Sequence, residues 1–259
     1  MGARKMNRLL KSNRAVSEVV GYVLVFGIVV VAIGAIYVGG LPALQSTKDA
    51  TQFKGVEQGF LILHTDLMKV ALDQSPVRTT KLGTAEGGSL SSNPAVCDLS
   101  LKIVVGGDVD ECTIPMGRIE FTSGIGSVAC ENGAVLTKYP SGTVMVSKPR
   151  MFNSTDQGNI MFSLIKINDS ASSVGGGIAR VTISNPRFNE SVFSTPEVYE
   201  NGYLNIMVNS EYAGAWKRFL EAEFSATFAG SADDTTGWSS DIRFNKLVVV
   251  EYIVSVDIG

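Results

Sequence analysis

The sequence predicts an α+β protein, in which a long N-terminal transmembrane and stalk helix precedes a β-rich antiparallel head domain with one late helix. Two features predict this fold: an uncharged, almost wholly apolar run at Val19–Val38, and short apolar segments separated by Gly, Asn, Asp, Ser and Pro from Lys81 onwards. The composition, 45% hydrophobic and 18% charged, is that of a globular protein with one membrane segment. We expect a basic leader over residues 1–15, a helix over 16–75 and an extracellular head over 76–259.

The apolar run is long enough to cross a membrane. About 20 residues that rise about 1.5 Å each match a hydrocarbon core of about 30 Å. A core helix of a soluble protein would show a polar face, and Val19–Val38 shows none. An ordinary secretory signal peptide is the alternative, but its apolar core spans about 7–15 residues and ends in a small-residue cleavage motif. Here the run is longer and is followed by Gly39-Gly40-Leu41-Pro42.

The charges before the span predict its orientation. Five basic residues and no acidic residue precede Glu18: Arg4, Lys5, Arg8, Lys11 and Arg14. Because basic residues stay on the cytoplasmic side, we expect the N-terminus inside and everything after Gly40 outside. Of the 22 Lys and Arg residues, 17 then remain against 25 acidic residues, which gives the rest a formal charge near −8. This excess of acid argues against a nucleic-acid partner, since phosphate binding needs clustered basic residues.

The start of the span carries a more specific pattern, Asn13-Arg14-Ala15-Val16-Ser17-Glu18-Val19-Val20-Gly21-Tyr22. This segment resembles the class III signal sequences of archaeal type IV pilin-like proteins, which open with RAVS(E/P)V(V/I)G. The resemblance implies that a membrane-embedded aspartyl prepilin peptidase cuts between Ala15 and Val16 and leaves the helix in place. It also implies a lollipop-shaped subunit that associates with its own kind or with other pilin-like subunits. The late segment SEYAGAWKRFLEAEF resembles such proteins more loosely.

Four positions are candidates for assembly: Glu18, Gly21, Gly27 and Gly34. Many bacterial pilins carry a glutamate at the fifth mature position, whereas Glu18 would be the third. In a helical bundle Glu18 could pair with the Val16 amino group of a neighbour, so that neither charge stays bare. Alternatively, it is an interfacial residue stabilised by the helix dipole. Glycines let membrane helices approach closely, although they are also common in such helices for no special reason.

Beyond Pro42 the sequence predicts an amphipathic helix from about Ala43 to Asp73, ended by Gln74-Ser75-Pro76. Its apolar positions recur at spacings of three and four: Phe53, Val56, Phe60, Leu63, Leu67, Val70 and Ala71. We expect Gly39–Pro42 to kink or loosen the chain where it leaves the bilayer. His64 is the only histidine and cannot alone build a histidine-rich metal site, so we interpret it as a surface or packed residue.

The head is predicted to be an antiparallel sandwich, or a sheet wrapped against the first helix. The predicted strands are Leu99–Val105, Arg118–Thr122, Ala134–Thr137, Thr143–Val146, Ile160–Ile167, Ala179–Ser184, Tyr203–Val208 and Leu247–Val256. The last is long and apolar and therefore central. Ser210 is a candidate N-cap for a late helix, in which Trp216 and Phe219 form either a core or a ligand-binding face, the core being favoured. Residues 230–240 read as a loop whose Trp238 is an exposed contact or a hydrophobic plug.

Three cysteines, Cys97, Cys112 and Cys130, allow one disulfide in an oxidising exterior. Cys97–Cys112 is the preferred pair, because the acidic turn Gly106–Glu111 could bring two strands together, but all three could also be reduced. Their spacing does not fit a zinc ribbon. We read two acidic groups as solvated rather than calcium-binding: Asp108, Asp110 and Glu111, and Asp233 with Asp234. Three sequons are glycosylation candidates: Asn153, Asn168 and Asn189.

No catalytic motif is present: the sequence has no G-x-S-x-G, P-loop or HExxH. We interpret the cluster Val174–Gly177 as a flexible loop rather than a phosphate cradle. We therefore expect no enzyme, no cofactor and no metal. The favoured hypothesis is a structural subunit of a pilus-like filament or pseudopilus, with its head exposed for adhesion. The alternative is a monomeric, membrane-anchored module that binds an extracellular ligand or partner.

Overall fold

The computed structural model describes residues 12–72, 74–154, 157–168, 171–186, 196–229 and 237–259, with side chains from residue 19 onwards except those of 84–86. The chain divides into two compact units, Met1–Thr51 and Gln52–Gly259. Helix α1 (Ser12–Ala71) contributes to both of them. Each unit is described by itself.

In the first unit, α1 carries an apolar surface that nothing in this unit covers. Every large hydrophobic side chain from Val19 to Val38 is exposed, from 47% for Val29 to 75% for Val38. Among the described helices, α1 alone is long and apolar enough to cross a membrane. Helical structure continues through Gly39–Pro42, because the missing N–H of one proline interrupts a helix without ending it.

In the second unit, the end of α1 buries one face. The residues at spacings of three and four are all buried: Phe53, Val56, Phe60, Leu63, Leu67, Val70 and Ala71. The predicted amphipathic pattern is therefore confirmed, and the helix ends at Ala71, two residues before the predicted end at Asp73.

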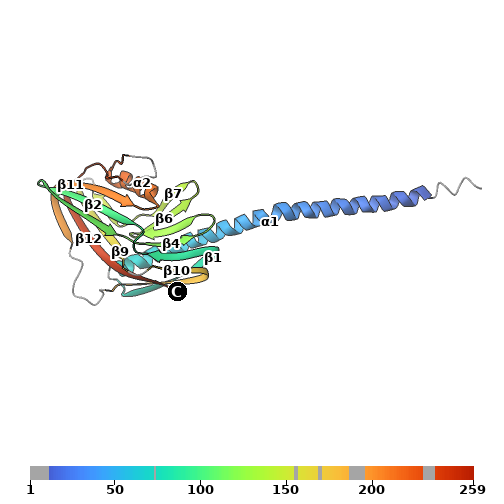
Figure 1. The fold of residues 1–259 in the computed structure, drawn as a ribbon, viewed down its shortest axis with the longest axis horizontal. Helices are drawn as coiled ribbons and strands as arrows, with labels where there is room; N and C mark the ends of the chain where they lie inside the picture. Colours follow the sequence, from blue (N-terminus) through green and yellow to red (C-terminus); the bar gives the residue numbers. More distant parts are fainter. Residues whose placement is uncertain (1–11, 73, 155–156, 169–170, 187–195, 230–236) are drawn as a thin grey trace, which may run out of the picture. The chain divides into compact units, whose positions relative to one another are not determined.

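Twelve strands among the described residues form one sheet (Figure 1). They are β1 (Val77–Asn93), β2 (Asp98–Val105), β3 (Asp108–Pro115), β4 (Arg118–Thr122), β5 (Ser127–Glu131), β6 (Ala134–Tyr139), β7 (Gly142–Ser147), β8 (Met151–Ser154), β9 (Asn159–Ile167), β10 (Ser172–Ser184), β11 (Glu197–Asn209) and β12 (Ile242–Ile258). The order is β3-β2-β11-β12-β10-β1-β4-β5-β6-β7, with β9 on β12 and β8 on β9. Every pairing is antiparallel except β9–β12. As predicted, the last strand is central.

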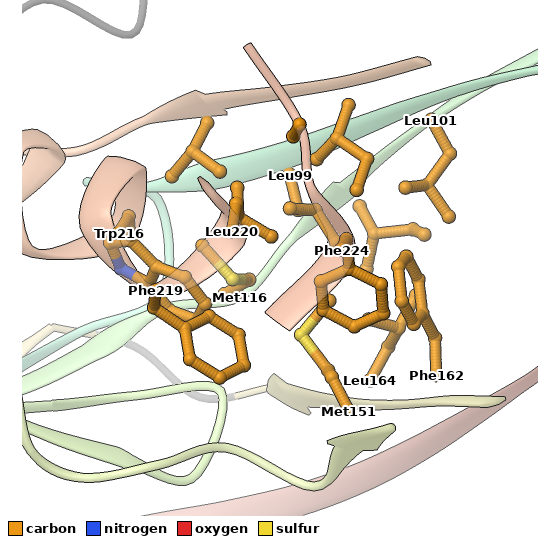
Figure 2. Packing of buried hydrophobic residues seen from close by; sticks show 14 of the residues in the cluster. Leu99, Leu101, Met116, Met151, Phe162, Leu164, Trp216, Phe219, Leu220 and Phe224 are labelled. Atoms are coloured by element: carbon orange, nitrogen blue, oxygen red, sulfur yellow. The ribbon is translucent and has the colours of Figure 1, made fainter. Parts of the chain in front are cut away.

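Residues of the sheet pack into two distinct hydrophobic cores. Consecutive residues of a strand point to opposite faces, and β5 shows the consequence: Val128 and Cys130 pack with α1, whereas Ala129 packs in the other core. That second core holds the apolar face of the late helix α2 (Ala213–Phe224). Figure 2 shows Trp216, Phe219 and Phe224 of α2 among side chains from the sheet. The favoured interpretation of Trp216 and Phe219 as core residues is confirmed.

The α+β class is confirmed, and each predicted strand overlaps an observed one. Four strands were not predicted: β1, β3, β5 and β8. The predicted flexible loop at Val174–Gly177 is wrong, because this segment lies in β10 and Val174, Gly175 and Gly177 pair with β1, where Leu90 faces Val174. Asp108, Asp110 and Glu111 form no acidic turn. They lie in β3, and Gly106 and Gly107, both with positive φ, make the turn before it.

Candidate functional site

A buried network of charged and polar side chains joins two strands to the start of α2. Arg118 and Glu120 come from β4, and Glu131 is the last residue of β5. Ser210, Glu211 and Tyr212 lie in the turn between β11 and α2, and Trp216 follows in the first turns of the helix. The network therefore fixes the entry of α2 against the β4–β5 hairpin.

Glu131 lies at the centre of the network, with a side chain that is 0% exposed. Its Oε1 accepts from Arg118 Nε at 2.7 Å, and its Oε2 accepts from Trp216 Nε1 at 2.8 Å. Ser210 Oγ lies 2.9 and 2.8 Å from the two oxygens, so its single hydrogen is shared between them. A buried carboxylate without such donors would be costly, so these contacts are what make its burial tolerable.

Arg118 is almost as deeply buried, with a side chain that is 3% exposed. Its Nη1 lies 3.3 Å from Glu120 Oε2 and 3.3 Å from Glu211 Oε1, and its guanidinium carbon lies 5.1 Å from the centre of the Tyr212 ring. Burial alone would lower the pKa of Arg118. The carboxylates of Glu131 and Glu120 outweigh burial and raise that pKa, so the guanidinium stays charged.

Tyr212 connects the ionic centre to the surface. Its hydroxyl lies 2.6 Å from Glu120 Oε1 and 2.8 Å from Ser127 Oγ. Because the carboxylate only accepts, Tyr212 donates its one hydrogen to Glu120 and accepts from Ser127. Burial, and then the bond to Glu120, raise the pKa of Tyr212, which keeps this hydrogen in place.

An open cleft of about 500 Å³ lies over this network. Its walls are the β4–β5 turn, the β6–β7 turn and Glu211, and Glu120 and Ser127 of the network also line it. Lys138 Nζ lies 3.4 Å from Glu211 Oε2 at the rim. Burial by itself would raise the pKa of Glu211, but the charges of Arg118 and Lys138 outweigh it and lower that pKa. The cleft thus presents carboxylates whose positions are fixed from behind.

The two hairpin turns that form the cleft are ordered by contacts of their own residues. In the β4–β5 turn the Ser123 backbone N–H and side-chain hydroxyl both donate to the Gly126 carbonyl, at 2.9 and 3.1 Å. In the β6–β7 turn, Tyr139 and Gly142 face each other in the pairing, and the Tyr139 ring packs on Phe53 at 5.8 Å. The cleft is therefore preformed.

The predicted processing and assembly residues all lie on α1. The backbone of Ala15, Val16 and Glu18 is helical, and their side chains lie outside the described part of the chain. At Gly21, Gly27 and Gly34 an added Cβ would meet no atom within 4 Å. Nothing within the described chain therefore requires glycine at these three positions.

The predicted Cys97–Cys112 disulfide is wrong, because all three cysteines are free. The strands are adjacent, as predicted, but their register separates the two thiols. Cys112 faces Leu101, whereas Cys97 lies beside Met116, four residues further along. Four residues of a strand span about 13 Å, too far for a disulfide. Cys97 instead donates to the Gly117 carbonyl at 3.1 Å.

The sequons differ in their environments. The Asn153 side-chain amide is half-buried in β8 and donates to the Glu223 carbonyl at 3.3 Å, so this nitrogen is already in use. Asn168 is exposed, and Asn189 lies outside the described residues.

The acidic residues considered as calcium ligands show no metal site in the described part of the chain. Asp233 and Asp234 lie outside the described residues. In β3, Asp110 accepts from the Tyr199 hydroxyl at 2.7 Å. The described residues contain no group of three or more acidic, His or Cys side chains that could hold a metal.

The sequence did not predict the buried network: Arg118, Glu120 and Glu131 were not singled out, and Ser210 and Trp216 were assigned other roles. One signal was present: a charged residue occurs inside or at the end of short apolar strands, as Arg118 and Glu120 do in RIEFT and Glu131 does in SVACE. Such residues are rarely buried unless they are paired. Ser210 was predicted as an N-cap, but the cap position is Tyr212, with no side-chain cap bond, and Ser210 instead bonds Glu131.

Comparison with known proteins places the chain in a family. It is 22% identical over 271 residues to an uncharacterized protein of Archaeoglobus fulgidus, and the match covers 86% of this chain and 88% of that protein. No solved structure matches it. The model described as "Family of unknown function (DUF7289)" matches residues 14–257. Since that match spans almost the whole chain, this protein belongs to the DUF7289 family.

Proposed function

We propose that this protein is a structural subunit of an archaeal type IV pilus-like filament or pseudopilus. A prepilin peptidase removes the basic leader between Ala15 and Val16. The remaining helix is held in the membrane with its N-terminus inside, and then packs with the same helix of other subunits. The globular unit, which is the second unit Gln52–Gly259, lies outside and makes surface contacts. This role is structural and requires no cofactor and no metal.

One observation carries the proposal: the RAVSEVVGY junction stands directly before an apolar helix that has no covering within its own unit. The exposed side chains from Val19 to Val38 need an apolar environment, which a bilayer or a bundle of like helices supplies. The open surroundings of Gly27 and Gly34 favour a bundle, because glycines that have no packing role within one chain leave room for a neighbouring helix.

A second candidate is a monomeric membrane-anchored binding module. The preformed cleft over Glu120 and Glu211 favours it, since a pure building block needs no such cleft. Both candidates use the same helix as a membrane segment. They differ in whether the subunit leaves the membrane to join a filament.

Electron microscopy of the surface material of cells that produce the protein tests the proposal. Antibodies against the globular unit should label filaments, and sheared fractions should contain the protein. Glu18→Gln should lower the amount of filament, because it removes the charge proposed to pair with a neighbour's Val16 amino group. The adjacent substitution Ser17→Ala is the matched control and should leave assembly unchanged. Label confined to the cell membrane in the wild type, with no filament, would favour the anchored module and exclude the subunit.

A further inference from the structure

We propose that the cleft between the β4–β5 and β6–β7 turns is a binding site for a neutral polyhydroxylated ligand, such as a short carbohydrate. The site is formed by Glu120, Glu211, Lys138 and Tyr139, with Arg118 behind it. Its exposure to the cell exterior rests on the proposed function. The binding chemistry itself does not depend on it.

The charge arrangement in the cleft selects the class of ligand. Glu211 is compensated by Arg118 on one oxygen and by Lys138 on the other. Glu120 is bonded by Arg118 on one oxygen and by the Tyr212 hydroxyl on the other. A cationic ligand would approach carboxylates that already have cations, and an anionic ligand would face two carboxylates. A ligand without charge avoids both penalties.

The polar groups that remain match hydroxyl groups. Each carboxylate oxygen has two lone pairs, so Glu120 and Glu211 can accept further hydrogen bonds at fixed positions. The Lys138 ammonium can donate to such a ligand. A sugar hydroxyl donates and accepts at the same time, and neighbouring hydroxyls of one ring can therefore satisfy a carboxylate and an ammonium together.

The cleft also has the size and the apolar surface that a sugar needs. Its volume of about 500 Å³ exceeds that of a single ring, and it is open rather than enclosed. Tyr139 and Pro140 of the β6–β7 turn and Ile125 of the β4–β5 turn provide apolar surface for the C–H face of a ring. The preformed turns and the buried Arg118 mean that little ordering accompanies binding.

Saturation-transfer NMR on the purified full chain in detergent micelles tests this site. The probes are methyl α-mannopyranoside, methyl β-galactopyranoside and methyl N-acetyl-β-glucosaminide, with lysinamide as cation and glucuronate as anion. At least one neutral glycoside should bind with a dissociation constant on the order of 1 mM, as expected for a ligand of this size. Glu211→Ala should weaken binding by about tenfold or more, since it removes an acceptor. Lys138→Met should weaken it as well.

The matched control is Glu221→Ala, which removes an exposed glutamate of α2 that does not line the cleft. It should leave binding unchanged, and thermal melting should show that all variants fold. Equal signals from the wild type and Glu211→Ala, binding of lysinamide or glucuronate in preference to the glycosides, or no neutral glycoside bound would each overturn the proposal. Because the assay needs neither cleavage nor filaments, its outcome is independent of whether the subunit assembles.

Discussion

Arg118 Nε and Glu131 Oε1 lie 2.7 Å apart between neighbouring strands, and neither side chain is more than 3% exposed. This ion pair is the only one among the described residues with both partners so deeply buried. It stands where the β4–β5 hairpin meets the start of α2, below the proposed ligand cleft. Its integrity therefore bears on both the stability of the globular unit and the geometry of the cleft.

Removing one partner of this pair should be strongly destabilising. Glu131→Leu leaves Arg118 buried without its principal carboxylate, and we expect a loss of about 3–5 kcal/mol in the free energy of unfolding. The measurement is urea unfolding in mild detergent, followed by tryptophan fluorescence, because Trp216 Nε1 donates to the same carboxylate. Lys148→Met is the control. It breaks the exposed pair with Glu223, in which Lys148 is 68% exposed, and should cost less than about 1 kcal/mol. A loss of less than about 1 kcal/mol for Glu131→Leu would contradict a stabilising role for the Arg118–Glu131 pair.

His64 should make stability depend on pH. Burial lowers its pKa in the folded protein below the ordinary 6.5, while the Gly133 backbone opposes this shift. The unfolded chain therefore binds a proton at His64 more tightly than the folded protein does. The free energy of unfolding then falls as the pH drops from about 7 through 6.5, down to the pKa of His64 in the folded protein. Melting temperatures measured between about pH 8 and pH 5 should fall less for His64→Gln than for the wild type. Identical pH profiles would refute the effect.

Glu211 should make stability depend on pH in a more acidic range than His64 does. Its pKa is depressed from the ordinary 4.5, so its contribution to stability is present above that pH and is lost as the pH falls through the folded pKa. Because its side chain is 62% exposed, the effect should be small and should diminish with added salt. Melting of Glu211→Gln against wild type below about pH 4.5, at low and high salt, measures it. An effect that is equal at both salt concentrations would show that the Arg118 and Lys138 charges are not its source.

The three thiols should differ in reactivity. Burial raises the pKa of Cys130 to about 12 and also raises the pKa of Cys97, with Glu131 adding to the effect in both. Cys112 is half-buried on β3, and burial followed by Asp110 raises its pKa as well. Iodoacetamide at about pH 8 should therefore modify Cys112 slowly and the other two hardly at all, until the protein is unfolded. Peptide mapping without reductant that finds any disulfide would contradict the free state of these cysteines.

Gly27 and Gly34 should be needed for filament assembly but not for the folding or membrane insertion of the single chain. They are seven residues apart and so lie on nearly the same side of the helix. Since a Cβ at either would meet no atom within 4 Å, and leucine favours helix by roughly 1 kcal/mol over glycine, Gly27→Leu and Gly34→Leu should fold and insert normally. We expect at least about tenfold less filament from either variant. Val29→Leu, on the opposite side, is the control. Normal filament yield from the glycine variants would remove them from the packing interface.

The sequence predicted the fold where a pattern depends on local periodicity. The face of α1 from Phe53 to Val70, the late helix and the central last strand all follow from apolar spacing. Strands without such a pattern were missed: β1 is rich in Gly, Ser and Thr, and β3 is an exposed acidic strand. In both, pairing with a neighbouring strand decides the structure, and the identity of that neighbour is not encoded locally.

The candidate site was less predictable, because its members come from distant parts of the chain. Glu131 and Trp216 are 85 residues apart in sequence, and only the packing of α2 brings them together. The cysteines show the same limit. The segment Gly106–Glu111 was expected to bring two strands together, and β2 and β3 do pair there, but their register decides whether two thiols can meet.

The central claim is that the chain is processed as a pilin-like subunit, and mass spectrometry of the native N-terminus tests it most directly. The protein is isolated from membranes and from sheared surface material of cells that produce it, and its terminal peptide is sequenced. Cleavage between Ala15 and Val16 predicts a mature chain that begins at Val16 and retains the whole apolar helix. A protein that still carries Arg14 and Ala15, or one that has lost Val19–Val38, would contradict the proposed function.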